Sequence, residues 1–529
     1  MGEEVNHSRA LARSAGLVSA LTALSRLLGL VREMVFAALL GAGLHADAFQ
    51  IGFRIPNLLR DLFAEGALSA AFVPTYARVF ARDGRAAAHR LSSRLLTLLG
   101  VGLGGLVLLG MLLAEPIVGK LAPGFDPIPG KTEAAVFLTR VMFPFLPLVS
   151  FAAVAMGMLN AQGRYGPPAL APSMFNVMTV LWGGVLWAMG FGPAEVAIGW
   201  ALGTLLGGAA QFLIQVPPLW KDGWRLRPEW APRDPGIRHI AGLMAPATLG
   251  LAAVQVNIFV STSYASEQPG AVAWINYAFR ILYLPIGVFG VALGTIAGAR
   301  LARRAAEADL EGVRETLRQA LRMLAFLTVP ATLGLLLLRV PIVRLLYERG
   351  RFGPEDTQET AAALLFYSVG LVAYTGVKVL APAFYALGSP RVPVLASALA
   401  VATNLVAIAV LFPRMGFAAV ALGTSLGSLG NAAVLALVFE RQVGGLRRHG
   451  LGRAVVQMGL AGLAMLPVAW ASLVGLETAL GTRGLGAQLA TGLLPVASGA
   501  LAYIAVARLM GIEEARAIVG LVRGPRARH

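Results

Sequence analysis

The amino-acid sequence predicts an all-α polytopic membrane protein with about fourteen transmembrane helices. The chain has 529 residues, of which 57% are hydrophobic and only 13% are charged, whereas a soluble domain carries about 25% charged residues. Its apolar runs are about 20 residues long, which is the length that a helix needs to cross a bilayer. Its basic residues gather in alternate loops between these runs, as cytoplasmic loops of membrane proteins do.

The apolar runs also predict how the helices are grouped. We expect an N-lobe at residues 1–218, a C-lobe at 219–442 and a C-terminal helix pair at 443–529. The predicted spans lie near residues 15–40, 47–76, 94–114, 134–158, 169–190, 195–217, 239–263, 271–299, 322–340, 357–385, 392–412, 416–439, 454–475 and 485–507.

The distribution of Lys and Arg predicts the orientation. With the N-terminus in the cytoplasm, the inside segments hold 29 of the 44 basic residues, the outside loops hold 8, including Lys131, and the spans hold 7. Because positive charge accumulates on the cytoplasmic side, we expect both termini there. The net charge of +17 is spread over many short loops, so we expect no nucleic-acid partner.

An internal repeat predicts that the two lobes are pseudo-symmetric. Phe53-Arg54-Ile55 recurs as Phe279-Arg280-Ile281, and further matches fall at nearly the same offset. With six helices in each lobe, the repeats have the same orientation in the membrane. Transporters built from such repeats bind their substrate between the lobes.

Arginines inside the first two spans are the strongest sign of function. A central arginine costs about 2.5–3.5 kcal/mol on insertion scales, so four of them facing lipid would cost on the order of 10 kcal/mol. We therefore predict that they line a wet cavity, where the planar guanidinium suits phosphate oxygens. Snorkelling to the interface is the alternative, and it stays open above all for Arg54. The arginines are Arg26, Arg32, Arg54 and Arg60, with Asp47 and Glu65 as local counter-charges.

Several motifs speak against an enzyme. The GxGxxG run at Gly100 and the GxSxG run at Gly423 lie within apolar spans, without the strand and turn context that their chemistry needs. The chain has no Cys and its six His are scattered, so we expect neither a disulfide nor a metal site or cofactor. The charged segment Arg303–Arg322 is interpreted as a solvated amphipathic surface helix rather than a regulatory site.

A series of motifs resembles the MurJ (MviN) family of lipid II flippases, in the multidrug/oligosaccharidyl-lipid/polysaccharide exporter superfamily. The resemblance extends over most of the chain and is specific because the motifs occur in order. They are SRLLGLVRE (25–33), DAF (47–49), RIPNLLR (54–60), FAEGA (63–67), FVP (72–74), LNAQGRY (159–165), QVN (255–257), NYAFR (276–280), PIGVFGVA (285–292) and KVLAPAFYA (378–386).

This resemblance implies a function. It implies two lobes around a cationic cavity, a final helix pair that forms a groove for a polyprenyl tail, and alternating access. The substrate would be lipid II, the undecaprenyl-pyrophosphate-linked disaccharide-pentapeptide, which moves from the cytoplasmic to the periplasmic leaflet of the bacterial inner membrane. The candidate substrate-binding residues are Arg26, Arg32, Arg60, Arg280, Arg54 and Asn57, and the candidate gating or counter-charge residues are Asp47, Glu65 and Lys378.

Energy coupling is where the sequence departs from the family. Phe279 and Tyr283 stand where members often carry an acid, and spans seven, eleven and twelve contain no carboxylate. Sodium coupling is therefore in doubt, and the membrane potential is an equally good source of energy. We expect a monomer whose other partners are membrane lipids.

Two rival functions stay open at this point. One is an exporter of another polyprenyl-linked glycan or of drugs, although drug-cation export usually needs embedded acids and these spans are basic. The other is a membrane glycosyltransferase, which needs a catalytic outer loop. The longest outer loops, 115–133 and 340–356, are short for that purpose.

Overall fold

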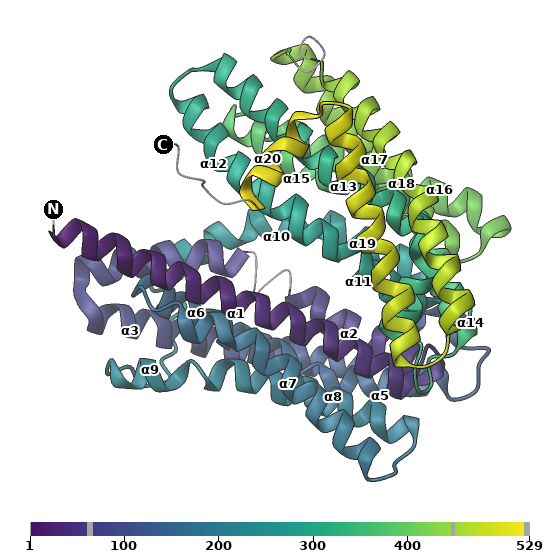
Figure 1. Cartoon of the computed structure of the whole chain (residues 1–529). Helices are drawn as coiled ribbons and strands as arrows, with labels where there is room; N and C mark the ends of the chain where they lie inside the picture. Colours follow the sequence, from purple (N-terminus) through teal and green to yellow (C-terminus); the bar gives the residue numbers. More distant parts are fainter. Residues whose placement is uncertain (1, 61–66, 446–449, 523–529) are drawn as a thin grey trace. The chain divides into compact units, whose positions relative to one another are not determined.

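The computed structural model describes residues 2–60, 67–445 and 450–522, and all the secondary structure assigned in them is helical (Figure 1). The helices divide into two compact units. The first unit comprises Met1–Ala273 with Arg349–Phe352, and the second comprises Trp274–Glu348 with Gly353–His529. The predicted all-α fold class is thus confirmed.

The first unit is built around a core of aromatic side chains. Phe36 of α1 and Phe49 of α2 pack with ring centroids 5.1 Å apart, and Phe53, Phe145 and Phe175 continue the cluster. Its helices are α1 (Gly2–Leu40), α2 (Leu44–Arg60), α3 (Ala67–Leu112), α4 (Ala114–Leu121), α5 (Lys131–Met142), α6 (Phe145–Ala161), α7 (Gly166–Ala188), α8 (Pro193–Leu213), α9 (Val216–Lys221) and α10 (Pro235–Ser266), with a 3-10 turn, η2, at Pro123–Phe125.

The second unit is organised around α13, which packs against α12, α14, α15, α18 and α19. Two buried apolar clusters hold it, one with α12, α15 and α17 and the other with α18 to α20. Its helices are α11 (Ala271–Pro285), a π-helical segment η3 (Ile286–Val291), α12 (Ala292–Ala306), α13 (Leu310–Tyr347), α14 (Pro354–Val369), α15 (Leu371–Ala386), α16 (Arg391–Met415), α17 (Ala418–Gln442), α18 (Leu451–Leu480), α19 (Leu485–Leu509) and α20 (Glu513–Val522).

The described residues of each predicted span are mainly helical, and the count of fourteen stays a prediction. By length and composition, ten of these helices or helix pairs can cross a membrane, and the α14–α15 pair, bent by 43°, makes eleven. The other predicted spans correspond to α1, α2 and α10. Helices α1 and α2 carry the intramembrane arginines, and α2 has only 17 residues. A search for long apolar helices with few charges therefore does not find these two helices.

The predicted second span, 47–76, is only partly described. It falls on α2 as far as Arg60 and on α3 from Ala67, and residues 61–66 lie outside the described residues. Helix α3 then bends at Gly84, whose φ of 80° suits a residue without a side chain.

The prediction of one surface helix at Arg303–Arg322 is wrong, because α12 ends at Ala306 and α13 starts at Leu310 and continues far beyond Arg322.

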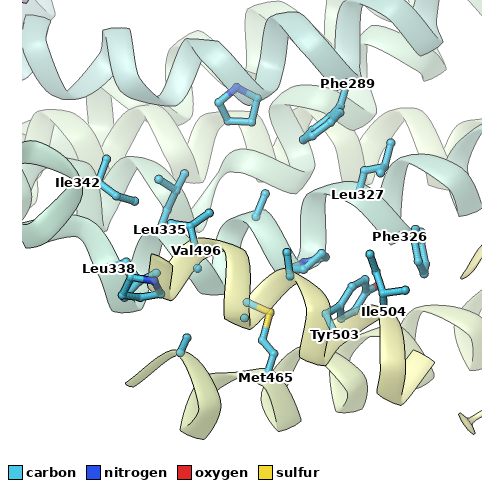
Figure 2. A pocket seen from close by; sticks show the side chains of 18 residues that line it. Phe289, Phe326, Leu327, Leu335, Leu338, Ile342, Met465, Val496, Tyr503 and Ile504 are labelled. Atoms are coloured by element: carbon cyan, nitrogen blue, oxygen red, sulfur yellow. The ribbon is translucent and has the colours of Figure 1, made fainter. Parts of the chain in front are cut away.

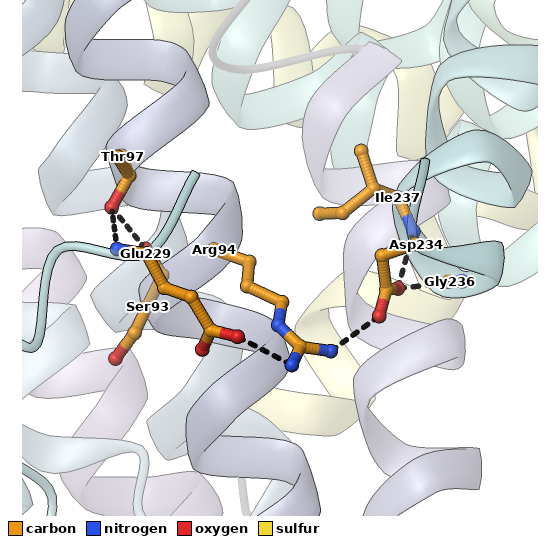
Figure 3. A network of polar contacts seen from close by, with 7 residues as sticks. All are labelled: Ser93, Arg94, Thr97, Glu229, Asp234, Gly236 and Ile237. Atoms are coloured by element: carbon orange, nitrogen blue, oxygen red, sulfur yellow. Dashed lines mark hydrogen bonds and ion pairs between the residues drawn. The ribbon is translucent and has the colours of Figure 1, made fainter. Parts of the chain in front are cut away.

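The packing divides the chain later than the predicted lobe boundary at residue 218. Helix α10, expected to open the C-lobe, packs against α3 and belongs to the first unit. A polar network explains this grouping (Figure 3). Arg94 of α3 lies 2.5 Å from both Glu229 and Asp234, and the backbone N–H of Glu229 donates to Thr97 Oγ1 at 3.0 Å.

This network fixes the loop between α9 and α10 and also starts α10. Asp234 Oδ1 accepts hydrogen bonds from the backbone N–H groups of Gly236 (2.8 Å) and Ile237 (3.1 Å), so it caps the helix N-terminus. The hydrogen bond from Arg94 holds the pKa of the Glu229 carboxyl below its usual range. Glu229 therefore stays ionised at neutral pH and keeps its contact with Arg94.

We expect the two roles of Asp234 to separate by mutation. Asp234→Ala removes the cap and one partner of Arg94, and loss of a cap alone costs about 1 kcal/mol. Asp234→Asn keeps a capping oxygen and loses only the charge, so it should be less destabilising. The measurement is the apparent unfolding temperature of the purified protein in detergent, followed by tryptophan fluorescence. Equal unfolding temperatures for Asp234→Ala and the wild type would contradict the capping role.

Candidate functional site

The predicted arginines of α1 occupy two different environments. Arg26 is exposed, whereas the side chain of Arg32 is only 14% exposed. Arg32 forms an ion pair with the adjacent Glu33, and its guanidinium lies 5.0 Å from the centroid of the Phe175 ring. A guanidinium over an aromatic face is attracted by the ring quadrupole. Arg32 is therefore held in a defined orientation, while Arg26 remains accessible.

Helix α7 fixes the arginine-bearing part of α1. Asn176 of α7 is largely buried, and its side-chain amide donates a hydrogen bond to the backbone carbonyl of Ser25 at 3.1 Å. Gly29 faces the same amide, which would lie 3.7 Å from an added Cβ. Neither Phe175 nor Asn176 was predicted as a site residue from the sequence. Both lie on α7, about 140 to 150 residues from the arginines, so no local pattern links them.

Arg54, Asn57 and Arg60 share one side of α2. Residues three apart on a helix are separated by about 60° in azimuth, so the three side chains fall within one 120° sector. All three are half-buried, and Pro56 between them is buried. The motif therefore presents two guanidinium groups and one amide along a common face.

Asp47 forms the most deeply buried ion pair among the described residues. Its side chain and that of Lys131 on α5 are 0% and 1% exposed, with Nζ 2.7 Å from Oδ2. The Lys131 ammonium also lies 4.1 Å from the centroid of the Phe125 ring. Lys131 was predicted to lie in an outer loop. That assignment is wrong, because α5 begins at this residue and buries it.

The same carboxylate also caps the start of α11. Asp47 Oδ2 accepts a hydrogen bond from the backbone N–H of Gly270 (2.8 Å), and Oδ1 accepts one from Ala273 (2.9 Å). These N–H groups have no partner within their own helix, and the positive end of the helix dipole favours an anion there. Asp47 thus joins α2, α5 and the first turn of α11 through one carboxylate, and the chain up to Ala273 belongs to the first unit.

The remaining predicted site residues lie in the second unit or outside the described residues. Arg280 on α11 and Lys378 on α15 are both exposed. Helices α12 and α15 are in close contact at Lys378, because an added Cβ at Gly294 would lie 2.4 Å from the Lys378 carbonyl oxygen. Glu65 lies outside the described residues. Arg26, Arg32, Arg54, Asn57, Arg60 and Asp47 all belong to the first unit.

Aromatic residues occupy the positions next to Arg280 where the family often has an acid. The Phe279 ring packs against Tyr283 (6.2 Å between centroids) and Tyr367 (5.4 Å). On α17, whose predicted span 416–439 contains none of the carboxylates that a sodium site favours, Thr424 donates to the Val420 carbonyl and Ser425 to the Phe366 carbonyl, each at 2.7 Å. In the described part of the chain, no three His, Asp or Glu side chains gather in a way that could hold a metal ion.

An apolar cavity of about 450 Å³ lies within the second unit, between α13, α19 and the end of α11 (Figure 2). Phe289, Leu335, Met465 and Tyr503 point toward it, and α18 contributes to its wall. Small residues and prolines along α13 and α19 keep the helices from filling this space. Among them are Pro330, Gly334, Pro495 and Gly499.

The buried pair makes a strong prediction about stability. Lys131→Met leaves the Asp47 carboxylate buried without its cation, and such a loss costs about 3–5 kcal/mol. The double variant Lys131→Met with Asp47→Asn removes both charges and should recover part of that loss. The apparent unfolding temperatures of the single and double variants test this. Additive effects of the two substitutions would show that the side chains are not coupled.

Known proteins resemble this chain over most of its length. The family model described as "Lipid II flippase MurJ" matches residues 36–485. The "Probable lipid II flippase MurJ" of Vibrio cholerae is 37% identical over 440 residues, covering 82% of this chain and 83% of its own length. The "Lipid II flippase MurJ" of Burkholderia cenocepacia is 36% identical over 440 residues, with coverages of 82% and 83%.

Solved structures agree on the fold. A structure of "Lipid II flippase MurJ, inward closed conformation" is similar with a TM-score of 0.78 at 24% identity, covering 95% of this chain and 100% of its own. An inward-facing multidrug resistance transporter of the MATE family, in the MOP superfamily, has a TM-score of 0.67 at 16% identity, with coverages of 82% and 99%.

Proposed function

The chain belongs to the lipid II flippase family MurJ, and we propose that it moves the polyprenyl-pyrophosphate-linked peptidoglycan precursor from the cytoplasmic to the periplasmic leaflet by alternating access. In this proposal the protein is a transporter and not an enzyme. It acts as a monomer in the bacterial inner membrane, with both termini in the cytoplasm, and its partners are lipid II and membrane lipids. The 29-to-8 distribution of basic residues supports this orientation.

The observation that carries the proposal is the arginine-rich surface of α1 and α2. A pyrophosphate-linked head group is doubly anionic and cannot cross hydrocarbon without replacement of its hydration shell. Arg32, held by Glu33 and Phe175, and Arg60, in the sector shared with Arg54 and Asn57, offer planar forks that match phosphate oxygens. Arg26 and Arg280 supply further exposed guanidinium groups for the same purpose.

The apolar cavity of the second unit supports the proposed placement of the lipid tail. Its walls come from helices of the predicted C-terminal pair together with α13. A polyprenyl chain buries only hydrocarbon, so an apolar cavity of about 450 Å³ accommodates part of it without desolvating polar groups. The head group and the tail are thus bound by separate kinds of surface.

Asp47 is proposed to act in gating as well as in stability. Its carboxylate holds the first turn of α11, the helix that carries Arg280, against α2 and α5. A change of conformation that moves α11 must break these hydrogen bonds. When these bonds break, the buried Asp47 carboxylate loses two hydrogen-bond donors and keeps only Lys131. The conformations with and without these bonds are therefore two distinct states. The roles of Glu65 and Lys378 as counter-charges remain predictions.

The proposal predicts a specific requirement for Arg32. Arg32→Ala should abolish growth of a flippase-depleted bacterium that depends on this chain, and Arg32→Lys should impair it, because an ammonium keeps the charge but loses the bidentate fork. The matched control is Arg82→Ala, which removes an arginine whose side chain is 84% exposed. Growth with Arg32→Ala at wild-type abundance would argue against a substrate-binding arginine at this position.

The energy source is proposed to be the membrane potential rather than sodium. A potential of 100 mV supplies about 2.3 kcal/mol per elementary charge. Its inside-negative sign favours outward movement of an anionic head group and inward return of the empty cationic site.

We therefore expect flipping in vesicles to continue when sodium is replaced by potassium or choline, and to slow when an ionophore collapses the potential. The rate of appearance of lipid II in the outer leaflet is the measurement. Strict sodium dependence that is indifferent to the potential would exclude this mode of coupling.

A further inference from the structure

A second basic site lies within the second unit, where α12 ends and α13 begins. There a cavity of about 620 Å³ is lined by Arg300, Arg303 and Arg304 from α12 and by Glu315, Thr316 and Gln319 from α13. We propose that this cavity binds the phosphate group of an anionic membrane phospholipid. The inference is independent of the proposed transport activity, because it concerns a different cavity and a different ligand.

The cavity is built on a rigid helical hairpin. Leu301, Val313 and Leu317 are fully buried between α12 and α13. The turn that joins the helices is closed by Asp309, whose carboxylate accepts from the Gly312 N–H at 2.8 Å and pairs with Arg304 at 2.7 Å. The hairpin therefore brings the arginines of α12 and the polar residues of α13 to one cavity.

The acids of this region are already paired, which leaves a positive excess in the cavity. Arg318 donates to Glu315 at 2.6 and 2.8 Å, and Gln319 donates to the same carboxylate at 2.6 Å. Arg304 is occupied by Asp309. Glu307 lies 3.7 Å from Arg303, whose side chain is 71% exposed. Among the described residues, no ion pair involves Arg300.

Arg300 and Arg303 match a phosphate, because Arg300 has no ion pair among the described residues and the contact of Arg303 with Glu307 is a long one between exposed side chains. Arg300 and Arg303 are three apart on α12, so their guanidinium groups project from the same side of the helix. Each offers a planar fork to phosphate oxygens, and the Thr316 hydroxyl lines the same cavity from α13. A solvated surface helix needs no such arrangement, because its arginines do not converge on a concave space.

The position on the helix indicates a lipid rather than a soluble anion. Helix α12 ends the apolar segment Ala271–Ala306, which is long enough to span the membrane. Ile296, one turn before Arg300, is 55% exposed and lies on the same side of α12. Along α12 the exposed apolar residues are therefore followed by arginines. We place this change at the membrane interface, where the phospholipid phosphates lie, on the side proposed to face the cytoplasm.

The test uses the full-length purified protein and native mass spectrometry with added phosphatidylglycerol. The variant Arg300→Ala with Arg303→Ala should weaken the first phosphatidylglycerol adduct by roughly fivefold for each arginine, the effect of one basic residue at an anionic membrane surface. The matched control is Arg82→Ala with Arg85→Ala, which removes two exposed arginines on either side of the bend in α3 at Gly84. Thr316→Val is a second test that changes no charge, and it should also weaken the adduct.

Three results would overturn the proposal. They are equal affinity in the wild type and the double alanine variant, equal loss in the Arg82/Arg85 control, and equal retention of phosphatidylcholine by the wild type. A final competition experiment adds inorganic phosphate to the complex with phosphatidylglycerol. If it displaces phosphatidylglycerol from the wild type at the concentration of the lipid, the site takes a soluble phosphate and the assignment to a lipid is wrong.

Discussion

The structure depends on one constraint, which is that a charged side chain in a low-dielectric interior must be paired or must face water. The chain meets this constraint in three ways. Arg32 is paired with its neighbour Glu33 and an aromatic ring, Lys131 is paired with Asp47 in a fully buried site, and Arg26 is left exposed. Each solution serves a different purpose. Pairing fixes the orientation of a side chain, a buried ion pair joins helices, and an exposed charge remains available to a ligand.

The separation of these roles explains how one chain handles an amphipathic substrate. Basic and amide groups of α1 and α2 provide a polar surface in the first unit, while α13, α18 and α19 enclose an apolar cavity in the second. Asp47 belongs to the same helix as Arg54 and Arg60 but binds the start of α11. Helix α2 thus carries both the basic face and the carboxylate that caps the first turn of α11.

The sequence was sufficient for properties that are local and insufficient for those that depend on distant partners. The apolar runs predicted the all-α membrane fold, and the arginine motifs led to the family. The role of Lys131 could not be predicted, because it stands beside a loop and its partner is 84 residues away. The role of Asn176 could not be predicted either. Its partner is the backbone carbonyl of Ser25, and every residue has such a group, so the sequence gives no sign of the contact. Helix α10 belongs to the first unit because Arg94 of α3 binds Glu229 in the loop before α10. The two residues are 135 positions apart in the sequence.

The central claim is that guanidinium groups of α1 and α2 carry the pyrophosphate head group across the membrane. The most direct measurement is translocation of lipid II with a fluorescent peptide in proteoliposomes that contain the wild type or the variant Arg32→Ala with Arg60→Ala. We predict that the wild type transfers the lipid between leaflets faster than protein-free liposomes, and that the variant does not. Equal rates for the wild type and a correctly folded variant would contradict the account.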